Sequence, residues 1–163
     1  MLRRPEAADA ERIYARYAGD AEVTKYLSWP RHRSVEETRA FLAFSDAEWK
    51  RWPAGPYLVE SLGEGTLVGG TGLAFEAPDV ASTGYVFARD AWGRGYASEA
   101  LRAMVDLARD LGVGRLYALC HPENRASVHV LEKCGFTLEC VLREDRLLYK
   151  RRAGETACAT TRM

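Results

Sequence analysis

The sequence predicts a mixed α/β fold in a single domain that spans residues 1–163. Three observations support this prediction. Apolar side chains recur at helical spacing over residues 1–50, short strand-like runs separated by glycine fill residues 57–87, and helical spacing returns from about residue 95. A chain of 163 residues is also long enough to build one continuous core.

Two helices are expected in the N-terminal third of the chain. Pro5 suits the first turn of a helix, and the apolar spacing that follows runs to a stop at Gly19. An aromatic-rich stretch over residues 20–33 is expected to be irregular. Ser34-Val35-Glu36-Glu37 is a capping-box signature, which predicts a second helix that ends near Trp49.

The middle and C-terminal parts are expected to alternate between strands and helices. Residues 57–59, 67–75 and 82–87 are typical of an antiparallel meander. A helix from about 95 to 111 follows, because one apolar stripe repeats through it and glycine ends it. The remaining predicted elements are a strand over 116–120, a helix over 125–134 and closing strands over 136–142 and 147–150.

The overall composition excludes several classes of protein. There are 23 basic and 23 acidic residues, and a zero net charge argues against a general nucleic-acid binder, which carries a basic excess. No stretch approaches the roughly 20 apolar residues that span a bilayer, and no apolar segment follows the basic N-terminal residues. The sequence therefore predicts a soluble cytoplasmic protein without a membrane partner.

The cysteines and histidines are not arranged as a metal site. The four cysteines are Cys120, Cys134, Cys140 and Cys158, and the three histidines are His32, His121 and His129. They are not placed at ligand spacing, so no metal is expected. We interpret the cysteines as reduced thiols, several of them buried as small apolar side chains.

A glycine pair stands between a predicted strand and a predicted helix. Phe87 ends the strand, and Gly93 and Gly95 come directly before the helix. Glycine lets a backbone approach an anion closely, and the first amides of a helix have no intrahelical acceptor. The turn therefore fits a pyrophosphate, but Ser98 replaces the third glycine of a dinucleotide fingerprint and the P-loop lysine is absent.

Two segments resemble the GNAT superfamily of N-acetyltransferases, and its RimJ/RimL-like branch in particular. Ala91-Trp92-Gly93-Arg94-Gly95-Tyr96-Ala97 resembles the acetyl-CoA loop, whose pattern is Gln/Arg-x-x-Gly-x-Gly/Ala; Trp92 replaces the leading Gln/Arg. Asn124 to Phe136 resembles the helix with the pattern Asn-x-x-Ser…Glu-Lys-x-Gly-Phe. The likeness extends over nearly the whole chain, although Leu2-Arg3-Arg4 leaves little room for the family's first strand.

The resemblance implies a GNAT fold and an acetyl-CoA site. The implied sheet is mixed and largely antiparallel, has about six or seven strands, is flanked by about four helices, and splays open to admit pantetheine. A bulge near Val86 and Phe87 is expected to aim an N–H at the thioester oxygen. Asn124 is expected to bind the pantetheine amides, with a helix N-cap as its alternative role. The residues assigned to acetyl-CoA are Val86, Phe87, Gly93, Arg94, Gly95, Tyr96, Ala97 and Asn124.

The resemblance also implies a reaction in which an amine attacks acetyl-CoA directly within a ternary complex. Ser127 is the candidate acid for the leaving thiolate, because many relatives use a tyrosine where this chain has Leu131. A surface serine is the alternative interpretation of Ser127. The base stays open among Glu76, Tyr85 and His121.

The acceptor wall is expected to include Trp29, His32 and Glu76. Candidate acceptors are a protein N-terminal α-amine and a small amine such as an aminoglycoside. A non-catalytic acyl-CoA sensor is the alternative of a different class. Family habit suggests a homodimer, and no nucleic-acid partner is expected.

Overall fold

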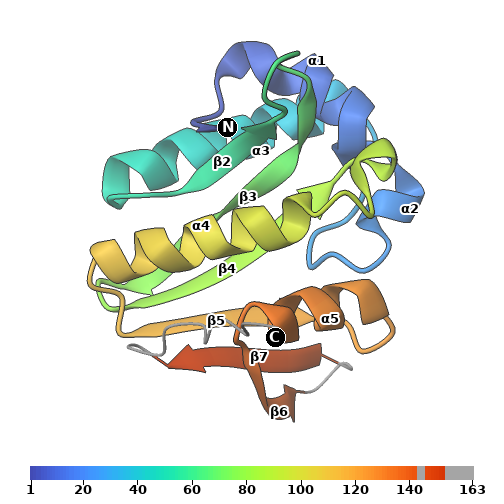
Figure 1. Ribbon diagram of the computed structural model, residues 1–163. Helices are drawn as coiled ribbons and strands as arrows, with labels where there is room; N and C mark the ends of the chain where they lie inside the picture. The colour runs from blue at the N-terminus through green and yellow to red at the C-terminus, as the bar shows by residue number, and fades with distance from the viewer. Residues whose placement is uncertain (143–145, 153–163) are drawn as a thin grey trace.

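The computed structural model describes residues 1–142 and 146–152 and has the mixed α/β fold that the sequence predicts (Figure 1). The strands are β1 (Leu2–Arg3), β2 (Pro56–Glu60), β3 (Leu67–Ala77), β4 (Val80–Phe87), β5 (Arg115–Cys120), β6 (Thr137–Leu142) and β7 (Arg146–Arg152). They form one seven-stranded sheet in the order β1-β2-β3-β4-β5-β7-β6. Only the β4–β5 pair is parallel among these described strands, and all other neighbours are antiparallel.

The helices differ from expectation mainly near the N-terminus. The helical segments are η1 (Ala7–Asp9), α1 (Ala10–Ile13), η2 (Tyr14–Ala18), α2 (Ala21–Thr24), α3 (Val35–Arg51), η3 (Arg89–Ala91), α4 (Tyr96–Asp110) and α5 (Arg125–Lys133). The stretch expected to be irregular contains α2, because the Asp20 carboxylate accepts the N–H groups of Glu22 and Val23 and caps a short helix.

The second predicted helix begins where expected, but its cap differs from a full capping box. Ser34 precedes α3 with extended backbone, yet its side chain makes no capping hydrogen bond in the described structure. Glu37 does reach back, and its carboxylate accepts the backbone N–H of Arg33 at 2.8 Å. This bond goes to the residue before the N-cap, so neither of the two reciprocal bonds between Ser34 and Glu37 that define a capping box is formed in the described structure.

The sheet is covered on both faces (Figure 1). On one face, Leu101 and Met104 of α4 are buried against a cluster that includes Leu73 and Phe75 of β3. On the other, Ile13 of α1 belongs to a second cluster formed with the N-terminal helices. Strands β3 and β4 therefore lie between α4 on one face and the α1–α3 layer on the other.

The sheet opens between β4 and β5. Their pairing runs from Val80 with Arg115 to Ser82 with Tyr117 in the described residues. Beyond these pairs β4 continues to Phe87 against β3, whereas β5 continues to Cys120 against β7. This confirms the splayed sheet, and it leaves one backbone edge of each strand available beyond Ser82 and Tyr117.

The predicted bulge near the end of β4 is wrong. β4 keeps an unbroken register with β3 from Gly69 opposite Phe87 to Phe75 opposite Ala81, and the register shift comes after Phe75. The reason lies in the close approach of the two strands at Gly69, where a Cβ atom would lie 2.2 Å from the Val86 carbonyl oxygen. Glycine on β3 permits a regular, tight ladder where the bulge was expected.

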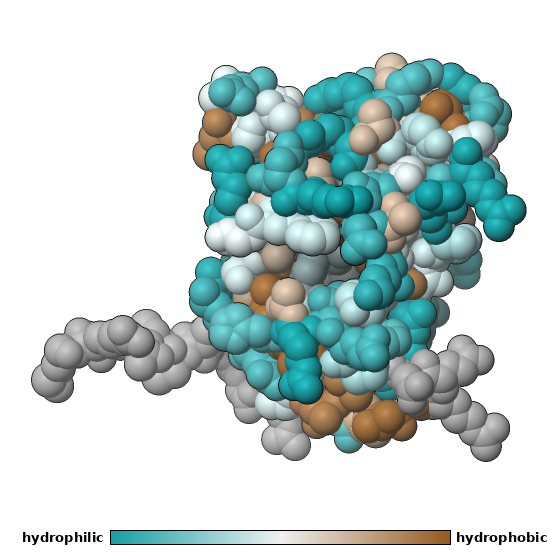
Figure 2. Space-filling model, turned by 90° about the vertical axis from the view of Figure 1, so that its right-hand side faces the viewer, coloured by the Kyte–Doolittle hydropathy of each residue, from teal (hydrophilic) through white to brown (hydrophobic). Residues whose placement is uncertain are grey.

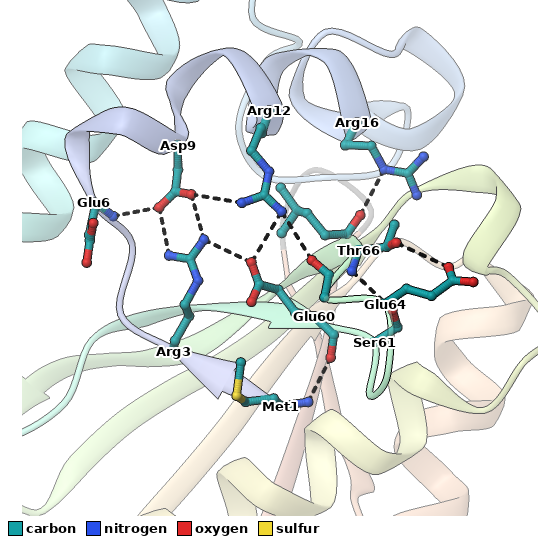
Figure 3. Close-up of polar contacts among 12 residues, drawn as sticks. Met1, Arg3, Glu6, Asp9, Arg12, Arg16, Glu60, Ser61, Glu64 and Thr66 are labelled. Carbon is teal, nitrogen blue, oxygen red and sulfur yellow. Dashed lines mark hydrogen bonds and ion pairs between the residues drawn. The ribbon is translucent and has the colours of Figure 1, made fainter.

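A buried ion-pair network ties the N-terminal strand to the helix after it (Figure 3). The Arg3 guanidinium bonds both oxygens of Asp9, at 2.6 and 2.8 Å, and Glu60 of β2 at 2.9 Å. Arg12 contacts the same two carboxylates at 3.6 and 3.3 Å. Asp9 and Glu60 are only 5% and 7% exposed, so the arginines stabilise charges that would otherwise be buried alone.

The far edge of the sheet carries exposed apolar side chains. Apolar atoms gather at the end of the molecule where β6 lies (Figure 2), and Leu138 and Val141 are among the exposed residues of that strand. Of the cysteines, Cys120 and Cys134 are buried free thiols, Cys140 is an exposed free thiol, and Cys158 lies outside the described residues. None of the helices in residues 1–142 and 146–152 has the length and apolar character needed to cross a membrane.

Candidate active site

A cleft of about 1420 Å³ begins in the opening between β4 and β5 and extends to the N-terminal helices. It brings together most of the residues that the sequence singled out. Those that line it are Trp29, His32, Val86, Phe87, Gly93, Gly95, Tyr96, Ala97, Asn124 and Ser127. Tyr85 and His121, two of the candidate bases, line it as well.

Two predicted site residues lie outside the cleft lining. Glu76 is exposed on β3, and its carboxylate accepts a hydrogen bond from the Tyr117 hydroxyl. Tyr117 belongs to the end of β5 that still pairs with β4, so Glu76 is held at the closed end of the opening. Arg94 is exposed in the loop before α4, with its guanidinium carbon 5.6 Å from the centre of the Tyr96 ring.

The start of α4 forms one end of the cleft. Gly95 is the N-cap of α4 and has φ +85°, a left-handed conformation that a side chain rarely adopts. The first intrahelical bond runs from the Glu99 N–H to the Gly95 carbonyl. The N–H groups of Tyr96, Ala97 and Ser98 therefore have no acceptor within the helix and, with the helix dipole, favour an anion.

The end of β4 offers backbone amides to the cleft. Ala88 N–H donates to Val68, and hydrogen-bonded pairs alternate along an antiparallel ladder, so Val86 bonds with Gly70. The amides of Tyr85 and Phe87 consequently face the opening. This refines the sequence prediction, which treated Val86 and Phe87 as equivalent.

Trp92 occupies the backbone carbonyl of Phe87 and leaves the backbone N–H of Phe87 available to a ligand. The indole Nε1–H of Trp92 donates to the Phe87 carbonyl at 2.8 Å. A carbonyl that already has a partner presents little acceptor capacity to a ligand, whereas the Phe87 N–H remains a donor. The sequence showed Trp92 only as a departure from the family pattern. A large side chain with one N–H donor in a loop was the available signal.

Ser127 is paired with Tyr85 inside the cleft. Their hydroxyl oxygens are 2.8 Å apart, and either group can donate. Burial raises the pKa of Tyr85, and the hydrogen bond from Ser127 only partly opposes this, so Tyr85 stays protonated at neutral pH. Leu131, at the family's tyrosine position, is buried in the core. The structure thus places a tyrosine hydroxyl from strand β4 beside Ser127 of helix α5.

Asn124 is engaged as a helix cap. Its Oδ1 accepts the backbone N–H of Ser127 at 3.1 Å, which is the alternative role that the sequence allowed. The side-chain amide NH₂ is a separate donor, and Asn124 lines the cleft. The capping bond fixes the side chain, so a ligand would meet Asn124 as a donor.

Two imidazoles lie in the cleft in different surroundings. His32 Nδ1 is 2.8 Å from the Thr38 hydroxyl, and burial lowers the pKa of His32. His121 Nδ1 accepts the N–H of Glu123 at 3.2 Å, and its ring lies 5.0 Å from that of Tyr26. Sequence reasoning missed Thr38, because a threonine inside a helix is not distinguishable from any other until its partner is known.

The chain is similar to known acetyltransferases in sequence. The family described as acetyltransferase (GNAT) domain matches residues 1–137. The uncharacterized N-acetyltransferase YoaA of Bacillus subtilis (strain 168) is 30% identical over 147 residues, covering 88% of this chain and 82% of that protein.

Solved structures are similar over almost the whole chain. A GNAT-family acetyltransferase from Bacillus anthracis has a TM-score of 0.80 and 27% identity, covering 94% of this chain and 95% of that one. The ribosomal L7/L12 alpha-N-protein acetyltransferase RimL, in complex with coenzyme A, has a TM-score of 0.83 and 25% identity, covering 93% and 92%.

Proposed function

The chain belongs to the GNAT acetyltransferase family and is an N-acetyltransferase, and we propose that it transfers the acetyl group of acetyl-CoA to an α-amine by direct attack. The observation that carries this proposal is the opening between β4 and β5, which ends at the free amides of α4. A strand-like pantetheine fits between two strands that have each lost a partner, and a pyrophosphate fits the helix start. Within the described residues, no cluster of acidic, histidine and cysteine side chains is arranged to hold a metal ion.

The residues of the cleft divide the work of the reaction. The Phe87 N–H faces the opening and would polarise the thioester carbonyl as it develops negative charge. Asn124 would donate to the pantetheine, and Gly93 to Ala97 would hold the pyrophosphate. The Ser127–Tyr85 pair would protonate the departing thiolate, because it is a hydroxyl donor that stays protonated in the cleft.

We expect Ser127→Ala to lower kcat by about tenfold while the acetyl-CoA Kd stays nearly unchanged. General acids are typically worth about 100-fold or more, but the neighbouring Tyr85 hydroxyl remains as a donor after the substitution. Single-turnover thiol release measures the chemical step directly. Tyr85→Phe should cost a similar factor, and the double variant should lose more than either. An unchanged single-turnover rate in the double variant would contradict the assignment.

An α-amine is the favoured acceptor because only a neutral amine attacks. At pH 7 an α-amine of pKa about 7.8 is roughly one-tenth neutral, whereas a lysine of pKa about 10.4 is neutral in about one molecule in 2,500. The likeness to RimL, an alpha-N-protein acetyltransferase, supports the same choice.

A panel of acceptors tests the proposal. Thiol release should be measured with peptides that carry a free α-amine, with the same peptides blocked at the N-terminus but containing a lysine, with a polyamine and with an aminoglycoside. We expect the highest kcat/KM for the free α-amines. A higher value for the blocked lysine peptides or the small amines would reassign the acceptor, and no release with any member would support a sensor.

A further inference from the structure

The two faces of β4 lead to different surroundings beside the same backbone. Successive side chains of a strand point to opposite faces of the sheet. Tyr85 packs with the cluster on the α4 and α5 face, where its hydroxyl meets Ser127. Val86 packs with the cluster formed by the N-terminal helices. A group held at the open edge of β4 therefore has the Ser127–Tyr85 pair on one side and the N-terminal helices on the other.

His32 lies on the Val86 side of β4. Its ring centre is 5.2 Å from that of Trp29 and 6.4 Å from that of Phe41. Both aromatic residues pack against the same cluster as Val86. The backbone N–H of His32 donates to the Ala18 carbonyl at 2.9 Å, which fixes this segment to the end of η2. The imidazole thus lies against two aromatic rings in a part of the cleft wall that also includes Glu37.

Thr38 fixes the orientation of the imidazole. Its hydroxyl is fully buried on α3 and lies 2.8 Å from His32 Nδ1. When Nδ1 carries the ring proton and donates it to Thr38 Oγ1, the lone pair of Nε2 is left free. Because a hydroxyl can donate as well as accept, the bond to Thr38 holds the ring in place, and the free Nε2 lone pair belongs to the tautomer with the proton on Nδ1.

The surroundings keep the imidazole neutral. Burial lowers the pKa of His32, and the charge of Glu37 on α3 opposes this only in part. The Glu37 carboxylate accepts the N–H of Arg33, and the ring neighbours Trp29 and Phe41 carry no charge. At pH 7 the ring is therefore a proton acceptor.

We propose that His32 Nε2 takes the proton from the acceptor amine, with Thr38 as the positioning residue. The inference rests on the proposed function. The amine nitrogen forms a bond to the thioester carbonyl carbon and passes one proton to His32. The carbon–sulfur bond breaks, and the thiolate takes a proton from the Ser127–Tyr85 pair. The products are the amide and coenzyme A, and solvent then removes the proton from His32 and returns one to the hydroxyl pair.

The test is the pH dependence of kcat/KM for one α-amine peptide in wild type and His32→Gln. Both the amine and His32 must be deprotonated in the wild type, so the plot of log kcat/KM against pH should approach a slope of two at low pH. In His32→Gln only the amine titrates, so the slope should stay at one. We expect kcat/KM at pH 7 to fall by about 100-fold, with the acetyl-CoA Kd unchanged.

His121→Gln is the matched comparison, because it makes the same substitution at the other imidazole of the cleft. It should keep the slope of two. A slope of one in His121→Gln with a slope of two in His32→Gln would overturn the proposal and assign the proton to His121. Wild-type enzyme that binds acetyl-CoA but releases no thiol with any amine would overturn the proposed function itself, and this inference with it.

Thr38 variants separate a positioning role from a structural one. Thr38→Val removes the hydroxyl at nearly constant volume and should lower kcat/KM for the amine while the acetyl-CoA Kd stays the same. Thr38→Ser retains the hydroxyl and should restore most of the rate. If both variants fold and show equal kcat/KM, the Thr38 hydroxyl has no part in orienting His32 and that part of the proposal is wrong.

Discussion

Replacement of Gly95 by valine should weaken acetyl-CoA binding by about 100-fold, or about 2.8 kcal/mol. A Cβ at Gly95 would meet no protein atom within 4 Å, so the side chain would project into open space at the start of α4. That space is where the proposed pyrophosphate lies. The left-handed backbone at φ +85° also disfavours valine, so the N-terminal amides would be displaced from their present geometry. Calorimetric titration with acetyl-CoA measures the effect.

Gly63→Val is the matched control for this experiment. Gly63 has φ +96°, its Cβ position is equally open, and it lies outside the cleft lining. Both variants should lose about 1–2 kcal/mol of folding stability from backbone strain, but only Gly95→Val should lose affinity. Equal Kd values for a folded Gly95→Val protein and for Gly63→Val would mean that the loop does not bind the cofactor.

Loss of the Arg3 guanidinium should lower the free energy of unfolding by about 3 kcal/mol, because two buried carboxylates lose their main partner. For a chain of this size the melting temperature should fall by about 6–12 °C. The contacts from Arg12 are longer and only partly compensate for the loss. Arg3→Ala tests the network, with unfolding followed by circular dichroism.

The same network makes stability depend on pH. Hydrogen bonds from Arg3 lower the pKa values of both Asp9 and Glu60 in the folded state. The stability that these two carboxylates contribute is fully present above the ordinary carboxyl pKa of about 4. It is lost as pH falls through their lower folded-state pKa values. Arg3→Ala should therefore destabilise the protein less at pH 3 than at pH 7.

Arg39→Ala is the control for a solvent-exposed arginine. Arg39 pairs with Glu11 and Glu36, both well exposed, and such pairs contribute at most about 1 kcal/mol. Equal melting temperatures for Arg3→Ala and Arg39→Ala would show that burial of the network carries no energetic weight.

Most of the fold was predictable because its signals are local. The start of α3 after Ser34 and the apolar stripe of α4 appear in a few consecutive residues. The short helix α2 was missed because one Asp20 carboxylate caps it, and such a side chain serves a turn equally well. The family resemblance, rather than periodicity, gave the splayed sheet.

The candidate site was predictable only in part, because its pairs join distant segments. Ser127 and Asn124 could be named from one motif, but the partner of Ser127 lies 42 residues away on β4. Glu76 was assigned to the acceptor wall from its place in a loop-like stretch. Strand β3 instead extends to Ala77, so Glu76 lies on this strand at the closed end of the opening between β4 and β5. A linear sequence does not show which strand edge stays unpaired.

The few pairs between β4 and β5 also affect how the molecule would respond to its ligand. Strands β5, β7 and β6 join the other four strands only through the pairs from Val80–Arg115 to Ser82–Tyr117 in the described residues. The two groups of strands can therefore separate with little loss of main-chain hydrogen bonding. An extended ligand lying between the strands would act as a missing eighth strand and join the halves into one cooperative unfolding unit. A free ligand concentration of about 100 times Kd would raise the free energy of unfolding by about 2.7 kcal/mol. Catalysis and mechanical integrity would then depend on the same backbone amides, those of Tyr85 and Phe87.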